Sequence, residues 1–435
     1  MTAADQLGSP LGGRLWPVTK KYWVLFAVLG TVAVCLYSTG TEWTLLNLQA
    51  TSLSVGVHNK PHALNHLTSS GDSLGETAND TPDKNTTSSV EPSSSPPLST
   101  PSTAHSPSTA TTPSTGERII TREHVAIVAY VPPGMPKFVR EAQHMLWSSW
   151  NYSVHQVDPS TRGNTDLIFF AHHDVVDGMP ASCVRLVDIS HAPSKSSSTS
   201  SAADRCYVVE HTPPADAYWH RYNFMFSLSF LAEPAYEPLL MSYDRLLRTD
   251  TDVVITPAFL TFRPRQFVVG RGGYMIEEYT KTRIKQLATD LHMTHQSLYN
   301  VGSTWFGNTS VTLLMVPKML DVAKFILESP KYNQDEGFPR WHPNVASMYA
   351  GELVVNHFIP KENVWVNLDS LDINCNGHEK TADVYHSHCW PGEYQGYFKK
   401  WAFERGEYTP VTFPRDKLDI AVINDYFMAM AVYGY

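Results

Sequence analysis

The sequence has few cysteines and no long run of basic residues. It contains 5 cysteines in 435 residues, and no Cys-x-x-Cys pair occurs, which disfavours paired redox thiols and a cysteine-based zinc site. The formal net charge is −9, and Lys and Arg form no extended cluster beyond the N-terminal stretch. This pattern argues against a nucleic-acid partner and favours small polar or anionic molecules.

The N-terminal stretch predicts a membrane anchor. Residues 1–21 include Arg14, Lys20 and Lys21, and an uncharged, mostly apolar run follows at residues 22–38. At about 1.5 Å per residue this run spans roughly 26 Å, enough for a thin bilayer. The positive-inside rule then predicts a single-pass type II protein with a cytosolic tail. A cleaved signal peptide is the alternative, although the leader is long and no clear Ala-x-Ala site follows.

Residues 39–117 have a composition typical of an extended lumenal stem. Ser, Thr and Pro dominate this segment, so it offers little that a core could use. N-glycosylation acceptors begin at Asn79, Asn85, Asn151 and Asn308, all on the predicted lumenal side. Residues 118–435 remain, about 320 residues, which suits one large α/β domain.

Four cysteines lie outside the predicted anchor, which contains Cys35. An even number in a compartment that permits disulfides indicates two bridges, although the sequence alone leaves the pairing open. We expect Cys183 to pair with Cys206 and Cys375 with Cys389, because each pairing closes a short loop.

Strand and helix patterns alternate along the globular part. The runs at residues 124–131 and 166–171 are β-rich and apolar, and Pro136 opens a helical pattern through residue 150. Aromatic residues at helical spacing over residues 218–231 predict a further core helix. This order predicts a doubly wound, mixed and mostly parallel sheet flanked by helices.

An acidic pair, Asp250 and Asp252, lies between two short apolar runs that are typical of buried strands. Two carboxylates one residue apart at a strand end form a hard oxygen site, suited to Mn²⁺ or Mg²⁺ that also holds a substrate diphosphate. Because about one Asp-x-Asp is expected by chance in a chain of this length, the strand context and the predicted compartment carry the argument.

The anchor, the stem and the segment Leu247–Val253 together resemble Golgi type II glycosyltransferases of the GT-A fold, over roughly residues 122–435. The chain also resembles an uncharacterised family of eukaryotic microbes with similar Gly-Ser-Thr-Trp and Gly-Glu segments. The first resemblance implies a Rossmann-type sheet and a nucleotide-sugar donor held through a metal. It implies that Asp252 is a metal ligand and that Asp250 faces the ribose or binds through water.

Two glycine-containing segments are candidate donor-binding loops. Arg271, Gly272 and Gly273 follow a strand at residues 267–269, where glycine allows close backbone approach and Arg271 could meet phosphate; a simple turn is equally consistent. In the predicted loop at residues 300–307, Ser303 or Thr304 could bind sugar hydroxyls and Trp305 could offer a stacking face.

Glu352 lies on a mostly apolar stripe of a predicted helix at residues 343–358. In an inverting transferase it could accept the proton of the acceptor hydroxyl, whereas in a retaining enzyme it could be structural or bind the acceptor. His386 and His388 lie on one side of an extended segment. By the same resemblance one of them is expected to be a late metal ligand, with core or exposed histidines as the alternative.

A rival site is the cluster His172, His173 and Asp174 at a strand end, which could hold a metal in a lumenal metallohydrolase or simply line a nucleotide cleft. The favoured prediction is a metal-dependent glycosyltransferase of the Golgi or ER membrane. Its donor is a UDP-sugar, or GDP-mannose as second choice, and its acceptor is a glycan or glycoprotein. A membrane-tethered, non-catalytic glycan-binding ectodomain is the alternative from another class.

Overall fold

The computed structural model describes residues 123–134, 136–189, 204–389 and 396–434. The predicted tail, anchor and stem, with the acceptors Asn79 and Asn85, therefore lie outside the described residues. Within the described ranges, no helix combines the length and the apolar character needed to cross a membrane.

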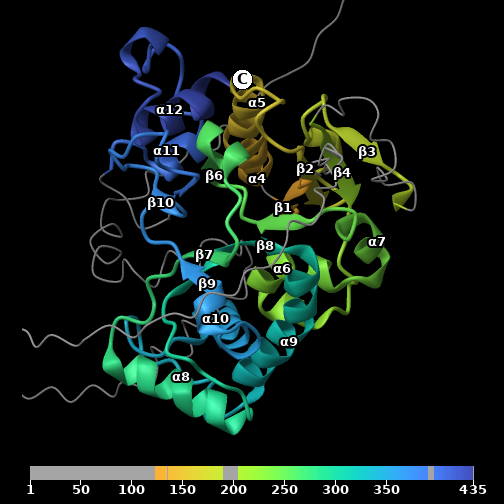
Figure 1. Ribbon diagram of the computed structural model, residues 1–435, viewed down its shortest axis with the longest axis vertical. Coiled ribbons are helices and arrows are strands. Elements are labelled where there is room, and N and C mark those ends of the chain that lie inside the picture. The colour runs from red at the N-terminus through yellow and green to blue at the C-terminus, as the bar shows by residue number, and fades with distance from the viewer. Residues whose placement is uncertain (1–122, 135, 190–203, 390–395, 435) are drawn as a thin grey trace, which may run out of the picture. The chain divides into compact units, whose positions relative to one another are not determined.

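The centre of the fold is an eight-stranded mixed sheet (Figure 1). In spatial order its strands are β3 (Val184–Leu186), β4 (Cys206–Glu210), β2 (Thr165–Ala171), β1 (Val125–Val131), β5 (Arg245–Arg248), β8 (Val301–Asn308), β7 (Phe267–Arg271) and β9 (Val364–Val366). Only β8 runs antiparallel to its neighbours, so the expected mostly parallel sheet is confirmed.

The central strands β1 and β2 are buried along their whole length. In β1 the side chains alternate between two hydrophobic clusters: Val128 belongs to one and Ile127 to the other. A strand covered on both faces reads as a continuous apolar run, and both strands show this pattern in the sequence.

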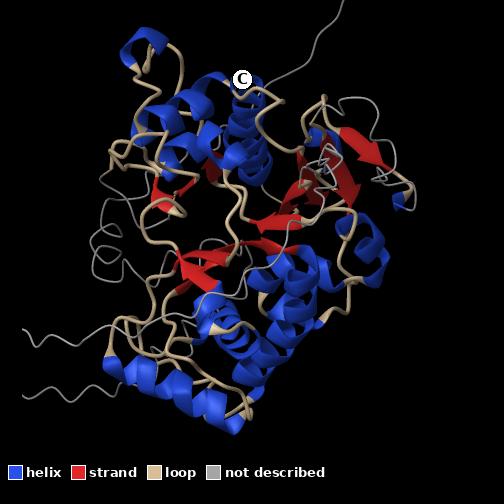
Figure 2. Cartoon of the chain, in the orientation of Figure 1, coloured by secondary structure: helices blue, strands red, loops and turns tan. Residues whose placement is uncertain are grey.

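Helices cover both faces of this sheet (Figure 2). On one face lie α6 (Phe226–Ser229), α8 (Glu278–Asp290), α9 (Thr309–Glu328) and α10 (Ala346–Phe358). On the other lie α4 (Pro136–Glu141) and α5 (Ser148–Gln156), joined by a π-helical segment at Ala142–Trp147. A short helix, α7 (Glu237–Leu240), precedes β5.

Two sequence expectations about local structure are wrong. Residues 218–231 form short 3₁₀ turns around the four-residue α6 instead of one helix, although most of their aromatic side chains are buried as expected. The segment at residues 300–307 is largely strand β8 instead of a loop. Its glycines allow close packing within the sheet, because a Cβ at Gly302 would collide with the backbone of Gly270.

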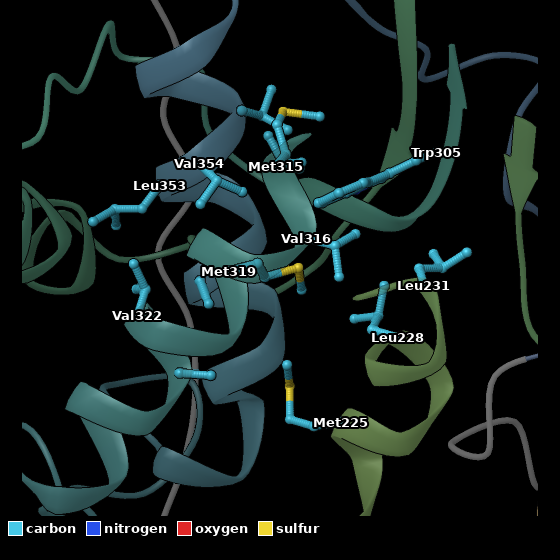
Figure 3. Packing of buried hydrophobic residues seen from close by; sticks show 14 of the residues in the cluster. Met225, Leu228, Leu231, Trp305, Met315, Val316, Met319, Val322, Leu353 and Val354 are labelled. Atoms are coloured by element: carbon cyan, nitrogen blue, oxygen red, sulfur yellow. The ribbon is translucent and has the colours of Figure 1, made fainter. Parts of the chain in front are cut away.

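The hydrophobic cluster that contains Val128 joins β8 to the helices packed on it. Figure 3 shows Trp305 among side chains of α9 and α10. Helix α9 follows β8 directly, and the side chain of Asn308 caps it by accepting bonds from the backbone amides of Ser310 and Val311 at 3.0 and 3.4 Å.

A second, three-stranded sheet pairs β6 (Val253–Ile255) with β11 (His386–His388) and β11 with β10 (Ile373–Asn374). Strand β11 runs antiparallel to β6, with His388 opposite Val253. Helices α11 (Lys400–Glu404) and α12 (Ile423–Tyr433) contribute to a third hydrophobic cluster, which also contains Met145 and Val254.

Both expected disulfides are present. Cys183 bonds to Cys206 at the β3–β4 edge, and Cys375 bonds to Cys389 between the ends of β10 and β11. The second bridge therefore ties down the strand that carries His386 and His388.

Candidate metal centre

The acidic pair lies at the carboxyl end of β5, in the middle of the main sheet. From β1 the chain proceeds outward to β2 and β4, then returns to β5 on the opposite side of β1. The carboxyl ends of β1 and β5 therefore flank the point at which the strand order reverses. Open α/β sheets bind ligands at such a switch point.

Asp250, Asp252 and His388 form the core of this site. One ligand atom from each lies within 4.8 Å of the others. Strand pairing causes this meeting, because β11 runs beside β6, the strand that begins directly after Asp252. His388 Nε2 lies 3.3 Å from Asp252 Oδ1, and the Cys389 amide donates to the Asp252 carbonyl at 3.2 Å.

A lysine holds the other oxygen of Asp252. Lys400 Nζ, at the start of α11, lies 2.6 Å from Asp252 Oδ2 and 3.2 Å from Glu141 Oε1. The Thr251 hydroxyl donates to Glu141 Oε2 at 3.0 Å. Helices α4 and α11, which are far apart in the sequence, thus supply a carboxylate and a cation to one buried cluster.

Asp250 is held by the arginine of the same segment. Arg248 donates to Asp250 Oδ1 at 2.9 Å and to the Ser303 carbonyl at 2.6 Å. It also donates to the Ser227 hydroxyl at 2.6 Å. Ser303 therefore reaches the site through its backbone, and the arginine fixes the direction of the Asp250 carboxylate.

Asp372 connects the two histidines to β8. Thr304 donates to Asp372 Oδ1 at 2.6 Å, and His386 Nδ1 lies 3.0 Å from the same oxygen. His386 Nε2 is 2.7 Å from the Thr249 hydroxyl, while His388 Nδ1 is 3.8 Å from Asp372 Oδ1. The absence of a side chain at Gly270 leaves space for Asp372, because a Cβ at Gly270 would collide with the Asp372 carboxylate.

Burial and charge pairing oppose one another in these groups. Burial raises the pKa of Asp252, but Lys400 and His388 outweigh it and hold that pKa well below its ordinary value. Burial lowers the pKa of His388, yet the carboxylates of Asp252 and Asp372 raise it to about 9. Burial raises the pKa of Glu141 to about 7, with Lys400 acting against it. The carboxylate of Asp252 is therefore firmly ionised.

Comparison with protein families gives a match over most of the chain. Residues 120–432 match the model described as "Domain of unknown function (DUF7164)". The chain belongs to this family. No curated protein matches the chain.

Among the residues predicted for this DUF7164 domain, Glu352 lies apart from the acidic pair in its contacts. It is 0% exposed, and its oxygens contact the Tyr274 hydroxyl at 3.0 Å and His295 Nε2 at 3.2 Å. An acceptor hydroxyl would have to displace one of these groups to reach it. The base role of Glu352 stays a prediction.

The other predicted donor contacts have different surroundings. The ring of Trp305 is 1% exposed and packs in the core, so it presents no open stacking face in this structure. Thr304 is buried and bonded to Asp372. Arg271 and Gly273 are exposed at the end of β7, and the Gly272 amide bonds to the Asn300 carbonyl at 2.7 Å. These three lie at the same sheet edge as the acidic pair, since β7 and β5 run in the same direction.

The rival cluster is also assembled. His172, His173 and Asp174 follow β2 and offer ligand atoms within 4.8 Å of one another. His173 Nε2 lies 2.8 Å from Asp174 Oδ1, and both side chains are 55% exposed. This second group is more open to solvent than the site around Asp252.

The sequence did not predict Glu141, Asp372 or Lys400 as site residues. Glu141 carried a signal, because it lies between Phe138 and Met145 on the apolar face of its helix, where a carboxylate needs a partner. Asp372 and Lys400 reach the site through tertiary packing, and their local sequence gives no comparable indication.

Proposed function

We propose that this protein is a metal-dependent glycosyltransferase that moves a sugar from a nucleotide-diphosphate sugar to a glycan or glycoprotein acceptor. The observation that carries the proposal is the meeting of Asp250, Asp252 and His388 at the carboxyl end of β5. The location suits a nucleotide, and the donor set suits a divalent cation.

Two carboxylates and one imidazole fit Mn²⁺, with Mg²⁺ as the alternative. Asp252 Oδ1, His388 Nε2 and a carboxylate oxygen of Asp250 would hold the ion. When bound, the ion would stabilise negative charge on the leaving diphosphate.

The surrounding residues would keep this donor set in place. Arg248 orients Asp250, and Lys400 orients Asp252 by holding the oxygen that points away from His388. The buried Asp372 supports the segment that carries both histidines. Such outer contacts are the usual means of fixing metal ligands.

The test is a donor panel with the full-length protein. UDP-sugars and GDP-mannose are incubated with Mn²⁺, and release of the nucleotide diphosphate is measured with and without glycoprotein acceptors. We expect Mn²⁺-dependent release from one donor, with a UDP-sugar as the first candidate, and faster release with the correct acceptor. Absence of turnover with every donor, combined with glycan binding, would favour the non-catalytic ectodomain.

A metallohydrolase is the second candidate function, because His172, His173 and Asp174 also form a possible metal group. The exposed side chains of His173 and Asp174 argue against a closed catalytic centre, whereas the side chains of Asp252 and His388 are 11% and 10% exposed. The predicted Golgi location and type II topology are part of the proposal and rest on the sequence of residues 1–38.

A further inference from the structure

Each carboxylate of the acidic pair already has a cationic partner from this chain. Arg248 Nη2 lies 2.9 Å from Asp250 Oδ1, and Lys400 Nζ lies 2.6 Å from Asp252 Oδ2. Counted by themselves, these two acidic and two basic side chains sum to no net charge, and Glu141 takes up part of the Lys400 charge. Cationic partners on both carboxylates weaken the attraction that the pair would otherwise exert on a dication.

These pairs are shielded from solvent. The side chains of Arg248, Lys400 and Asp252 are 2%, 12% and 11% exposed, respectively. Asp250 is the more open member at 31%. Because screening by water and salt is weak at buried sites, the charge of Lys400 acts strongly on anything bound to Asp252.

Other contacts keep Lys400 in place. Glu141 Oε1 lies 3.2 Å from its ammonium, and Glu404 Oε1 lies 4.0 Å away within the same helix. A metal on Asp252 Oδ1 would thus have an ammonium on the other oxygen of the same carboxylate. Repulsion between these cations offsets part of the attraction that the acidic pair supplies.

We propose that Arg248 and Lys400 neutralise the acidic pair in advance, so that the divalent cation binds tightly only together with an anionic diphosphate. The diphosphate would supply the negative charge that the neutralised acidic pair no longer offers to the cation. This inference rests on the proposed function and assigns a coupling between its metal and its donor. By linkage, the metal must strengthen diphosphate binding by the same factor.

The test compares Mn²⁺ binding in the parent, in Lys400→Gln and in Lys399→Gln, each as full-length protein. Lys399 is the matched control, because it is the exposed neighbour with the same charge. Free Mn²⁺ is measured by electron paramagnetic resonance with and without UDP, after correction for the Mn²⁺–UDP complex that forms in solution.

In the parent we expect UDP to tighten Mn²⁺ binding by about 10-fold or more. In Lys400→Gln we expect Mn²⁺ alone to bind about 10-fold or more tightly than in the parent, with a smaller enhancement by UDP. Lys399→Gln should behave as the parent does.

Unchanged or weaker Mn²⁺ binding in a folded Lys400→Gln protein would overturn the inference. If Lys400→Gln does not fold, the measurement on the parent protein still tests the inference. Tight Mn²⁺ binding by the parent without any enhancement by UDP would also overturn the inference. Both results would leave the metal site itself intact. Absence of Mn²⁺ binding under every condition would instead refute the proposed function.

Discussion

His388, at the end of β11, lies beside Asp252, which directly precedes β6, and its Nε2 atom is 3.3 Å from Asp252 Oδ1. The pairing of β11 with β6 sets this distance, and the disulfide between Cys375 and Cys389 lies beside it. The late histidine and the acidic pair are therefore parts of one structural unit. This relationship makes the roles of the two histidines separable by mutation.

Replacement of Asp252 by Asn should abolish Mn²⁺-dependent turnover, because the amide loses the charge that a metal ligand needs. It should also reduce the free energy of unfolding by on the order of 2–3 kcal/mol. Breaking a buried ion pair costs about 3–5 kcal/mol, and Glu141 still compensates part of the Lys400 charge. Donor turnover and chemical denaturation measure the two effects.

The matched control for this variant is Asp174→Asn in the exposed rival cluster. It should retain the parent's turnover and Mn²⁺ dependence. The opposite pattern, with activity lost in Asp174→Asn and kept in Asp252→Asn, would move the catalytic centre to the end of β2.

Replacement of His388 by Ala should raise the Mn²⁺ concentration for half-maximal activity by about 10-fold or more, as expected for a metal-site residue. His386→Ala should act mainly on stability, because His386 is 0% exposed and lies between Thr249 and Asp372. We expect it to cost on the order of 2 kcal/mol through lost hydrogen bonds and packing.

Titrations of activity against Mn²⁺ and denaturation curves for both variants test this contrast. The sequence left the choice between these histidines open. Equal Mn²⁺ dependence in the parent and in His388→Ala would remove the histidine from the metal site.

Much of the fold could be predicted because local patterns and tertiary environment agree. Strand β1 (Val125–Val131) is apolar throughout because the sheet is covered on both faces, and the helix ending at Phe358 is mostly buried. The prediction of a loop at residues 300–307 was wrong because glycines, considered without their neighbours in the sheet, are typical of a loop. In the sheet they accommodate neighbours such as Phe267, which lies against Gly307.

The site was predictable only in part for a related reason. Asp250 and Asp252 are separated by one residue in the sequence, so their spacing carries information. Lys400 and Asp372 reach the site through chain packing, and no local pattern marks a lysine that ends beside a distant carboxylate. Trp305 shows the converse error, because an aromatic residue beside small polar ones is typical of a sugar contact as well as of a core strand.

A chain beginning at Glu117 should fold without the predicted anchor and stem. Within the described residues the hydrophobic clusters begin at Val125, and the Ser, Thr and Pro composition of residues 39–117 offers little that a core could use. We expect its melting temperature to match that of the full-length protein, with donor turnover retained. Calorimetry on both proteins measures this, and loss of cooperative unfolding in the shorter chain alone would show that residues 1–116 support the fold.

The last prediction concerns the pH dependence of stability. Asp166 is 8% exposed in β2, and burial raises its pKa to about 6, even though the Arg205 amide and the Tyr243 hydroxyl donate to it. The folded state therefore binds the proton more tightly than the unfolded state does. Below pH about 4 both states are protonated, so this group makes stability fall as pH rises from about 4 to about 6.

The expected loss is on the order of 2–3 kcal/mol, from a pKa difference of roughly two units. Asp166→Asn should lack this component, because its amide does not titrate and can donate to the Tyr243 oxygen. Tyr243→Phe should enlarge it, because the ionised carboxylate loses a donor. Urea denaturation of the three proteins at intervals from pH 4 to pH 7 isolates the effect as a difference between curves. Parallel curves for the parent and Asp166→Asn would mean that this carboxyl ionises alike in the folded and unfolded chains.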